Sequence, residues 1–432
     1  MASKTVVPVQ SVRGSVAVRG DKSISHRAVI LGALSNRTCI VDNFLDGEDC
    51  LCTVEAFRAM GIAIERAGSH LQIAGKGLDG FKAPKKPVWC GNSGTTTRLL
   101  MGVLSGQPFE VAFEGDASLS KRPMDRVIDP LSKMGAFFLD VGDKPALLPL
   151  RMHGTHSVKP LQYKSPVASA QVKSAILLAG LYASGTTSVE EPSLSRDHTE
   201  RMLAASGVPV KREGTKASIQ GTATVRASMF QVPGDLSSAA FVLAAGLLKA
   251  PQEFVVKGVG VNPTRTGFID IVKAMGGACR LLKATESGGE PVADIVVKAG
   301  ALKGALIGGD LILRAIDEIP ILAVLATQAK GQTVISGAQE LRVKESDRLA
   351  ALREELSKMG ARVTEKPDGL VIEGPTMLKG TVVQSHGDHR LAMSLAIAAL
   401  AAEGPTTIED VDCVATSFPG FWTLLDSIRA HG

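Results

Sequence analysis

Six stretches of the chain are apolar over most of their length, and each follows a short strand-like segment and a polar turn. Their apolar bodies begin near Ser25, Thr95, Gln171, Ser237, Ile319 and Arg390. A helix that is apolar on all faces belongs inside a protein or a membrane. Each of the six is shorter than the roughly 18–20 apolar residues that a membrane span requires. The pattern therefore predicts six buried core helices.

A second element recurs in step with the first: an amphipathic helix that closes on a glycine. The closures are Met60-Gly61, Met134-Gly135, Ser206-Gly207, Met275-Gly276, Met359-Gly360 and His431-Gly432. Glycine is a common left-handed stop after a helix. A two-strand hairpin is predicted after five of them, for example Ala361–Thr364 with Leu370–Glu373. The sixth has none, so we expect an N-terminal hairpin of Thr5–Val9 and Gly14–Val18 to complete the sixth unit.

These recurrences predict an α/β protein of six repeat units closed by joining its ends. Three units would form domain one, residues 21–234. The other three would form a discontinuous domain two, residues 1–20 plus 235–432. The chain would then cross between domains near 20–21 and 233–235, where glycine and proline predict a hinge.

Composition narrows the class of protein. With 432 residues, 45% hydrophobic and 21% charged, the chain is long and apolar enough for two or three packed domains. Aromatic residues make up only 4% and the net charge is a mild +5. Both numbers argue against a nucleic-acid-binding surface, which needs stacking platforms and a strong basic face.

The cysteines and histidines give no sign of a metal centre. The six cysteines form no CxxC pair, and His386 and His389 lack further Cys or His residues at ligand spacing. We therefore expect no metal and no disulfide framework. The N-terminus has no apolar leader, so we expect a cytoplasmic protein without a membrane partner.

The polar turns before the six buried helices carry the candidate chemistry. They contain Lys22-Ser23 with Arg27, Asn92–Thr95 with Arg98, Ser169–Gln171 with Lys173, Asp235, Asp317-Glu318 and Asp388–Arg390. The N-terminus of a helix is partially positive and attracts anions. If three helices in each domain point the same way, their ends would form two clusters that build an anion-binding cleft. The residues alone leave open the alternative that each polar group only caps its own helix.

Three charged segments precede amphipathic helices. They are residues 120–125, 195–198 and 342–348. In the last, Glu345 lies between the cations Lys344 and Arg348. A carboxylate in cationic surroundings can donate or accept a proton, although helix capping with solvated charges also explains such segments.

With these residues in view, the chain resembles the 5-enolpyruvylshikimate-3-phosphate synthase family over essentially its whole length. The motifs are GDKSISHR at 20–27, GNSGT at 91–95, KRPM at 121–124, SAQVKSA at 169–175, SRDHTE at 195–200, IDE at 316–318, RVKESDR at 342–348 and GDHR at 387–390. The resemblance implies a two-domain inverted α/β barrel built from six βαβαββ repeat units, three per domain. That agrees with the repeat count read from the sequence.

The resemblance also implies an activity, that of a 3-phosphoshikimate 1-carboxyvinyltransferase. Such an enzyme transfers the enolpyruvyl group of phosphoenolpyruvate to the 5-hydroxyl of shikimate 3-phosphate and releases phosphate, a step of aromatic amino acid biosynthesis. It proceeds by addition and elimination without metal or cofactor. By family analogy, shikimate 3-phosphate would be held by Lys22, Ser23, Arg27, Ser169, Ala170, Gln171, Arg196, Asp317 and Lys344. Phosphoenolpyruvate would be held by Lys22, Asn92, Gly94, Arg122, Gln171, Arg348 and Arg390.

Three residues would be catalytic by the same analogy. Asp317 would act as base for the attacking hydroxyl, Glu345 would protonate the methylene carbon, and Lys22 would assist at the leaving phosphate. Gly94 implies inhibition by glyphosate, because insensitive members often carry Ala there. We expect a monomer. In one departure from the family, Thr416-Ser417-Phe418-Pro419 stands where some members have a lysine before a similar segment.

Three alternatives remain from the sequence. The enolpyruvyl transferase that acts on UDP-N-acetylglucosamine shares the fold, but typically has Lys-Asn in place of Lys22-Ser23 and a loop cysteine. A phosphate-binding ring without catalysis would bind ligand and release no phosphate. An RNA-end-processing relative of the same repeat type is disfavoured by the scarce aromatics and modest charge.

Overall fold

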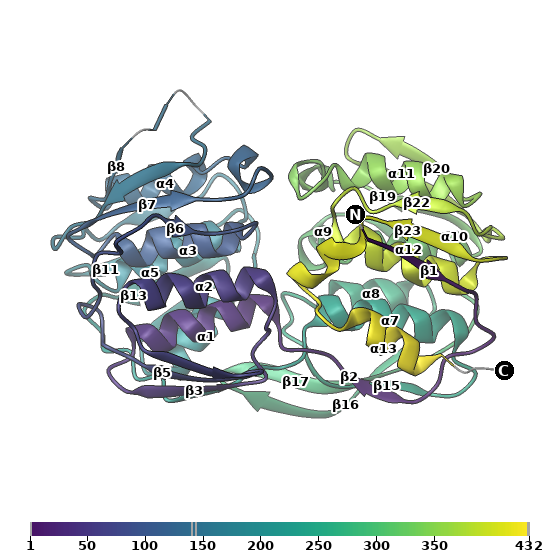
Figure 1. The fold of residues 1–432 in the computed structure, drawn as a ribbon, viewed down its shortest axis with the longest axis horizontal. Coiled ribbons are helices and arrows are strands. Elements are labelled where there is room, and N and C mark those ends of the chain that lie inside the picture. The colour runs from purple at the N-terminus through teal and green to yellow at the C-terminus, as the bar shows by residue number, and fades with distance from the viewer. Residues whose placement is uncertain (1, 140, 143–144, 430–432) are drawn as a thin grey trace. The chain divides into compact units, whose positions relative to one another are not determined.

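The computed structural model describes residues 2–139, 141–142 and 145–429, and Figure 1 traces the chain. The chain divides into two compact units. The 20–232 unit comprises Gly20–Val232 with Glu286–Glu290. The 233–432 unit comprises Met1–Arg19, Pro233–Thr285 and Pro291–Gly432. Each unit has its own hydrophobic core.

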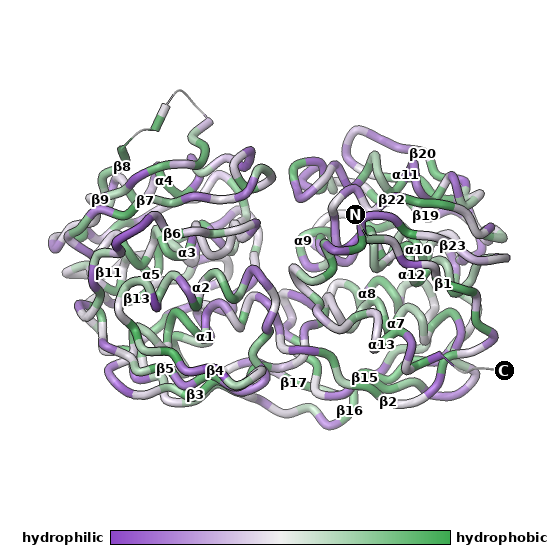
Figure 2. The backbone as a smooth tube through the Cα atoms, in the orientation of Figure 1, coloured by the Kyte–Doolittle hydropathy of each residue, from purple (hydrophilic) through white to green (hydrophobic). Residues whose placement is uncertain are grey.

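The six buried helices are present where the apolar pattern predicts them. They are α1 (Lys22–Leu34), α3 (Gly94–Leu104) and α5 (Ala170–Gly180) in the 20–232 unit, and α7 (Leu236–Lys249), α10 (Ile319–Gln328) and α12 (His389–Ala401) in the 233–432 unit. Within the 233–432 unit, α7, α10 and α12 pack on one another, and most of their residues are hydrophobic (Figure 2). Burying three apolar helices in each unit is what forms each core.

The remaining helices are shorter or amphipathic. They are α2 (Glu48–Ala59), α4 (Asp125–Lys133), α6 (His198–Ala205), α8 (Gly267–Ala274), α9 (Asp310–Ala315), α11 (Arg348–Lys358) and α13 (Phe421–Ile428), with short 3₁₀ helices η1 (Leu119–Lys121), η2 (Gln339–Val343) and η3 (Val411–Thr416). The closing glycines from Gly61 to Gly360 all have left-handed φ, between 78° and 106°, as predicted. The sixth predicted closure, His431-Gly432, lies outside the described residues.

Six small sheets repeat one plan. In the 20–232 unit they run β14 (Met229–Gln231), β3 (Thr38–Asp42), β5 (His70–Ala74), β4 (Ile64–Ala67); β6 (Val88–Trp89), β7 (Glu110–Glu114), β9 (Leu150–His153), β8 (Phe137–Leu139); and β10 (Gln162–Lys164), β11 (Thr186–Glu190), β13 (Lys216–Gln220), β12 (Val210–Glu213). Each begins with a parallel pair and continues with antiparallel strands. The predicted repetition of one α/β unit is confirmed.

The 233–432 unit repeats this plan. Its sheets run β2 (Ser15–Ala17), β15 (Phe254–Gly260), β17 (Glu290–Lys298), β16 (Ala278–Ser287); β18 (Leu306–Ile307), β19 (Gly331–Ile335), β21 (Gly369–Gly374), β20 (Arg362–Lys366); and β22 (Val382–Gln384), β23 (Thr406–Glu409), β1 (Ser3–Val6). The pairs β2–β15, β18–β19 and β22–β23 are parallel.

The predicted N-terminal hairpin is wrong in part. Strand β1 does complete the sixth sheet, antiparallel to β23. Strand β2, however, pairs in parallel with β15 and not with β1. The segment between the two strands is bound to the ends of two helices. The Val9 amide donates to the Leu400 carbonyl of α12, and the Val12 amide donates to the Lys249 carbonyl of α7. The two N-terminal strands therefore serve two different sheets.

The strands that precede α1 and α7 are exchanged between sheets. Strand β2 leads into α1 but pairs with β15, which follows α7. Strand β14 leads into α7 but pairs with β3, which follows α1. Each unit therefore contains a strand that enters a helix of the other unit. Within the described ranges, no helix is both long enough and apolar enough to cross a membrane.

Candidate active site

In the 20–232 unit, the N-termini of α1, α2, α3 and α5 lie together. Lys22, the first residue of α1, forms an ion pair with Asp49 in the first turn of α2. The Asp49 carbonyl accepts a hydrogen bond from Thr96 Oγ1 of α3 at 3.2 Å. Gln171 Nε2 of α5 donates to Thr95 Oγ1 of α3 at 2.9 Å. Four partially positive helix ends thus share one region of this unit.

Arg122 and Asn92 form a polar pair beside α3. Arg122 Nη2 donates to Asn92 Oδ1 at 2.6 Å, and Asn92 Nδ2 donates to Asp116 Oδ2 at 2.7 Å. Arg122 Nε is buried and has no hydrogen-bond partner among the described residues. A buried donor without a partner is costly, so this nitrogen is suited to an acceptor on a ligand.

Arg98 contributes a further cation that the resemblance did not assign to a ligand. Its Nη1 donates to Gln171 Oε1 at 2.7 Å and its Nη2 to the Pro123 carbonyl at 3.0 Å. Burial, together with the positive charges of Arg122 and Arg126, lowers the pKa of Arg98 to about 10. An anion placed near these guanidinium groups would relieve that repulsion.

Arg27 and Lys173 lie deeper and already have protein partners. Arg27 donates to Thr199 Oγ1 at 2.7 Å and to Ser174 Oγ at 2.8 Å, and burial lowers its pKa to about 10. Lys173 lies between Glu191 and Glu200, at 2.8 Å from each. Burial lowers the pKa of Lys173, but the two carboxylates outweigh burial and raise it. The charge of Lys173 is therefore balanced inside the protein, where its ammonium pairs with two buried carboxylates.

In the 233–432 unit, a fully buried arginine is surrounded by carboxylates. Arg348, the first residue of α11, donates from Nε to Asp388 at 2.7 Å and from Nη2 to Glu345 at 2.5 Å. Its Nη1 lies 3.6 Å from Asp317 and makes no hydrogen bond to a described residue. Burial lowers the pKa of Arg348, but Asp388, Glu345 and Asp317 outweigh it and raise that pKa.

Arg390 joins the same group from α12. Its Nη1 donates to the Asp317 carbonyl at 3.1 Å, and its Nη2 lies 3.7 Å from the Asp317 carboxylate. Asp388 caps α12 by accepting from the Arg390 amide at 2.8 Å. The N-termini of α10, α11 and α12 therefore meet within this unit. The sequence predicts such a meeting for the buried helices α10 and α12 but not for the amphipathic α11.

The predicted site residues fall into two groups. The 20–232 unit holds Lys22, Ser23, Arg27, Asn92, Gly94, Arg122, Ser169, Ala170, Gln171 and Arg196, and the 233–432 unit holds Asp317, Lys344, Glu345, Arg348 and Arg390. Ser169 caps α5, and its own amide donates to Glu191 at 2.8 Å. Arg196 and Lys344 are partly exposed. Each unit thus presents its own cluster of cations and helix ends.

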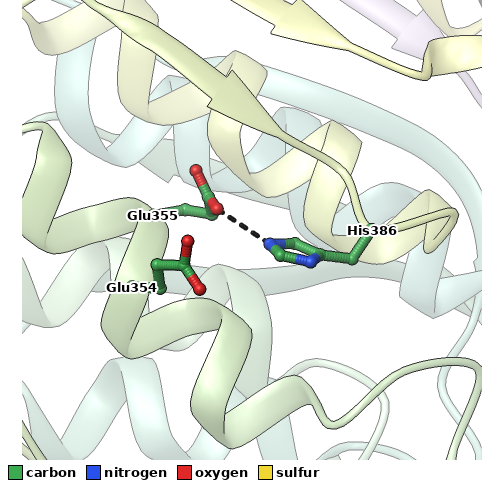
Figure 3. Close-up of side chains that lie close together, drawn as sticks. All are labelled: Glu354, Glu355 and His386. Carbon is green, nitrogen blue, oxygen red and sulfur yellow. Dashed lines mark hydrogen bonds and ion pairs between the residues drawn. The ribbon is translucent and has the colours of Figure 1, made fainter.

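One grouping was missed by the sequence reasoning. His386, noted there only for its spacing from His389, lies beside Glu354 and Glu355 of α11 (Figure 3). Lys358 contacts both glutamates, at 3.0 Å and 2.8 Å. Its ammonium already supplies the positive charge that these carboxylates need.

The fold is that of enolpyruvyl transferases of known structure. At the level of fold alone, the chain resembles the structure of "the enolpyruvyl transferase NikO from Streptomyces tendae", with a TM-score of 0.77 and 19% identity over 98% of this chain and 96% of that one. An EPSP synthase structure from Acinetobacter baumannii matches more closely, with a TM-score of 0.90 and 45% identity over 99% of this chain and 98% of that one.

Sequence comparison then fixes the family. The model of EPSP synthase (3-phosphoshikimate 1-carboxyvinyltransferase) matches residues 6–425. A 3-phosphoshikimate 1-carboxyvinyltransferase from Brevibacillus brevis is 52% identical over 98% of this chain and 99% of its own length. The chain belongs to the EPSP synthase family, which confirms the resemblance seen in its motifs.

Proposed function

We propose that this chain transfers the enolpyruvyl group from phosphoenolpyruvate to the 5-hydroxyl of shikimate 3-phosphate. The products are 5-enolpyruvylshikimate 3-phosphate and phosphate. The observation that carries the proposal is the group around Arg348, in which Asp317 and Glu345 flank a buried cation. That arrangement offers two carboxylates for proton transfer and a guanidinium nitrogen, Arg348 Nη1, for an anionic substrate.

We assign phosphoenolpyruvate to Lys22, Asn92, Gly94, Arg122, Gln171, Arg348 and Arg390. The buried Arg122 Nε and Arg348 Nη1 support this assignment, because each lacks a hydrogen-bond acceptor among the described residues. We assign shikimate 3-phosphate to Lys22, Ser23, Arg27, Ser169, Ala170, Gln171, Arg196, Asp317 and Lys344. Several cations are needed because both substrates are anionic and repel each other as they meet.

The proton steps follow from these placements. The 5-hydroxyl oxygen of shikimate 3-phosphate bonds to C2 of phosphoenolpyruvate while Asp317 accepts the hydroxyl proton. Glu345 donates a proton to C3. The tetrahedral adduct then loses phosphate, assisted by Lys22, while a proton leaves C3 and returns to Glu345. The proton taken up by Asp317 ends on the released phosphate, so both carboxylates return to their starting states. No net redox change occurs, and no metal or cofactor takes part.

The two groups of assigned residues belong to different units, so the proposed site requires the units to act together. We propose that the chain crossings near 20–21 and 233–235 serve as a hinge and that ligand anions draw the two cationic clusters together. We further propose that the enzyme acts as a monomer in the cytoplasm and that glyphosate inhibits it.

Phosphate release from phosphoenolpyruvate tests the function. Release should require shikimate 3-phosphate, and UDP-N-acetylglucosamine should not replace it. Release with UDP-N-acetylglucosamine alone would assign the chain to the rival transferase. Binding of both substrates without any release would leave a non-catalytic anion-binding protein.

A further inference from the structure

The cluster of Glu354, Glu355 and His386 lies outside the proposed site but is attached to it through α11 (Figure 3). Glu355 is completely buried, whereas the side chain of Glu354 is half exposed. Both carboxylates contact Lys358, and burial of a carboxylate requires such compensation. Lys358 therefore balances the negative charge of the two glutamates. The contacts that Glu355 makes with a neighbouring loop give the cluster its further importance.

Glu355 holds the loop that connects β22 to α12. Its Oε1 accepts from His386 Nε2 at 2.8 Å, and its Oε2 accepts from the Gln384 amide at 3.0 Å. The same loop is held a second time at Asp388, which Arg348 contacts at 2.7 Å. Arg348 and Glu355 are two turns apart on one helix, so they project from the same face about 10 Å apart.

The loop needs such support because its backbone is unusual. His386 has φ 54° and the following Gly387 has φ 68°. Residues with a side chain rarely adopt this left-handed conformation, and surrounding contacts must maintain it. The Gly387 amide donates to Ser385 Oγ at 3.1 Å, but the imidazole is fixed by Glu355.

We propose that Glu355 and His386 are positioning residues for the phosphoenolpyruvate site. They set the course of residues 384–388, and this course places Asp388 where it holds Arg348 and caps the helix that carries Arg390. The proposal rests on the assignment of Arg348 and Arg390 to phosphoenolpyruvate. It gives a buried carboxylate two helical turns from Arg348 a defined effect on one substrate.

Glu355→Gln is the primary test, with Glu354→Gln as the matched control. Both changes remove one negative charge beside Lys358, but only the first alters the contacts to His386 and the Gln384 amide. Glu355→Gln should raise the KM for phosphoenolpyruvate about three- to thirtyfold, which is less than the roughly ten- to hundredfold cost of losing a direct charge-assisted contact, because Glu355 acts through residues 384–388. The KM for shikimate 3-phosphate should stay within about twofold of wild type, as should both constants in Glu354→Gln.

A second pair of variants separates the imidazole from the backbone. His386→Gly removes the ring but tolerates φ 54°, whereas His386→Ala removes the ring and does not favour that angle. Both should raise the KM for phosphoenolpyruvate, and Glu355→Gln should add little in the His386→Gly background because the shared contact is already gone.

Thermal unfolding of each variant identifies a merely structural role. Equal loss of affinity for both substrates with a lowered unfolding midpoint would overturn the proposal, and so would an unchanged KM for phosphoenolpyruvate in folded Glu355→Gln and His386→Gly. If the wild type releases phosphate when given both substrates, such a result would overturn the positioning role and leave the proposed function standing. A wild type that releases no phosphate would overturn the proposed function together with this inference.

Discussion

Replacing Gly94 by alanine is expected to separate glyphosate binding from phosphoenolpyruvate binding. Gly94 is the first residue of α3. A methyl group there would lie 2.8 Å from Arg98 Nη1, well inside the 3.4 Å at which ordinary van der Waals contact begins. The Arg98 guanidinium is tethered to Gln171 at 2.7 Å and to the Pro123 carbonyl at 3.0 Å. It must move away from the methyl, and the hydrogen bond to Gln171 is weakened.

The magnitudes follow from these contacts. Partial loss of the charge-assisted hydrogen bond to Gln171 costs about 1 kcal/mol, or roughly fivefold in the KM for phosphoenolpyruvate. Glyphosate is the longer molecule and is expected to meet the methyl directly, so that overpacking of roughly 1–3 kcal/mol would add to this cost. Inhibition should therefore weaken by about fivefold to more than a hundredfold beyond the loss of phosphoenolpyruvate affinity.

Inhibition titrations against phosphoenolpyruvate measure both effects. In an Arg98→Ala background, Gly94→Ala should cause no further rise in the KM for phosphoenolpyruvate, because the displaced group is gone. Gly102→Ala is the control for stability, since its methyl would press on Ala175 in α5 and lower the unfolding midpoint without separating the two ligands. Equal losses for both ligands in Gly94→Ala, or a wild type unaffected by millimolar glyphosate, would refute the reasoning.

Three further predictions concern the site and its surroundings. Arg122→Ala and Arg348→Ala should each raise the KM for phosphoenolpyruvate about ten- to a hundredfold by removing a contact of roughly 1.5–3 kcal/mol, and steady-state kinetics showing unchanged values would reject the assignment. Glu345→Gln should bind both substrates yet lose roughly 10²–10⁴ in turnover, whereas near-normal turnover would move the proton step to another residue. Burial, with smaller effects from Lys22 and Arg27, holds the pKa of His26 well below 6.5. Below pH 6.5 the unfolded chain therefore binds a proton at this histidine that the folded chain does not. The free energy of unfolding should thus decrease as the pH is lowered. Chemical denaturation should show a shallower acid-side fall in His26→Gln, and an identical pH profile would contradict this.

The six buried helices were predictable because burial leaves a local mark on the sequence. Each apolar body, from α1 to α12, is contiguous and follows a polar cap such as Asp21 or Asp388. The left-handed glycines that follow the amphipathic helices were likewise predictable. The residue just after a helix often adopts that conformation, and glycine adopts it most readily. The family motifs indicated most of the candidate site for the same reason, since each is a short segment at a helix N-terminus.

The exchange of β2 and β14 between sheets was not predictable from local pattern. A short strand has the same alternation of apolar and polar residues whichever strand it pairs with. The sequence of Ser15–Ala17 therefore does not indicate that it pairs with β15. The partners of Arg98 and Glu355 were missed because Gln171 and His386 are distant in sequence. Lys173 showed the opposite limit: its place beside a polar turn made it a candidate for an anion-binding cluster, but Glu191 and Glu200 already balance its charge.

We propose that the cationic clusters of the two units act together on two anionic substrates. Small-angle X-ray scattering with and without saturating shikimate 3-phosphate tests it most directly, because anions that bridge the clusters should draw the units together. The radius of gyration should be smaller with shikimate 3-phosphate, and smaller again when glyphosate is added. A radius unchanged by saturating ligand would contradict it.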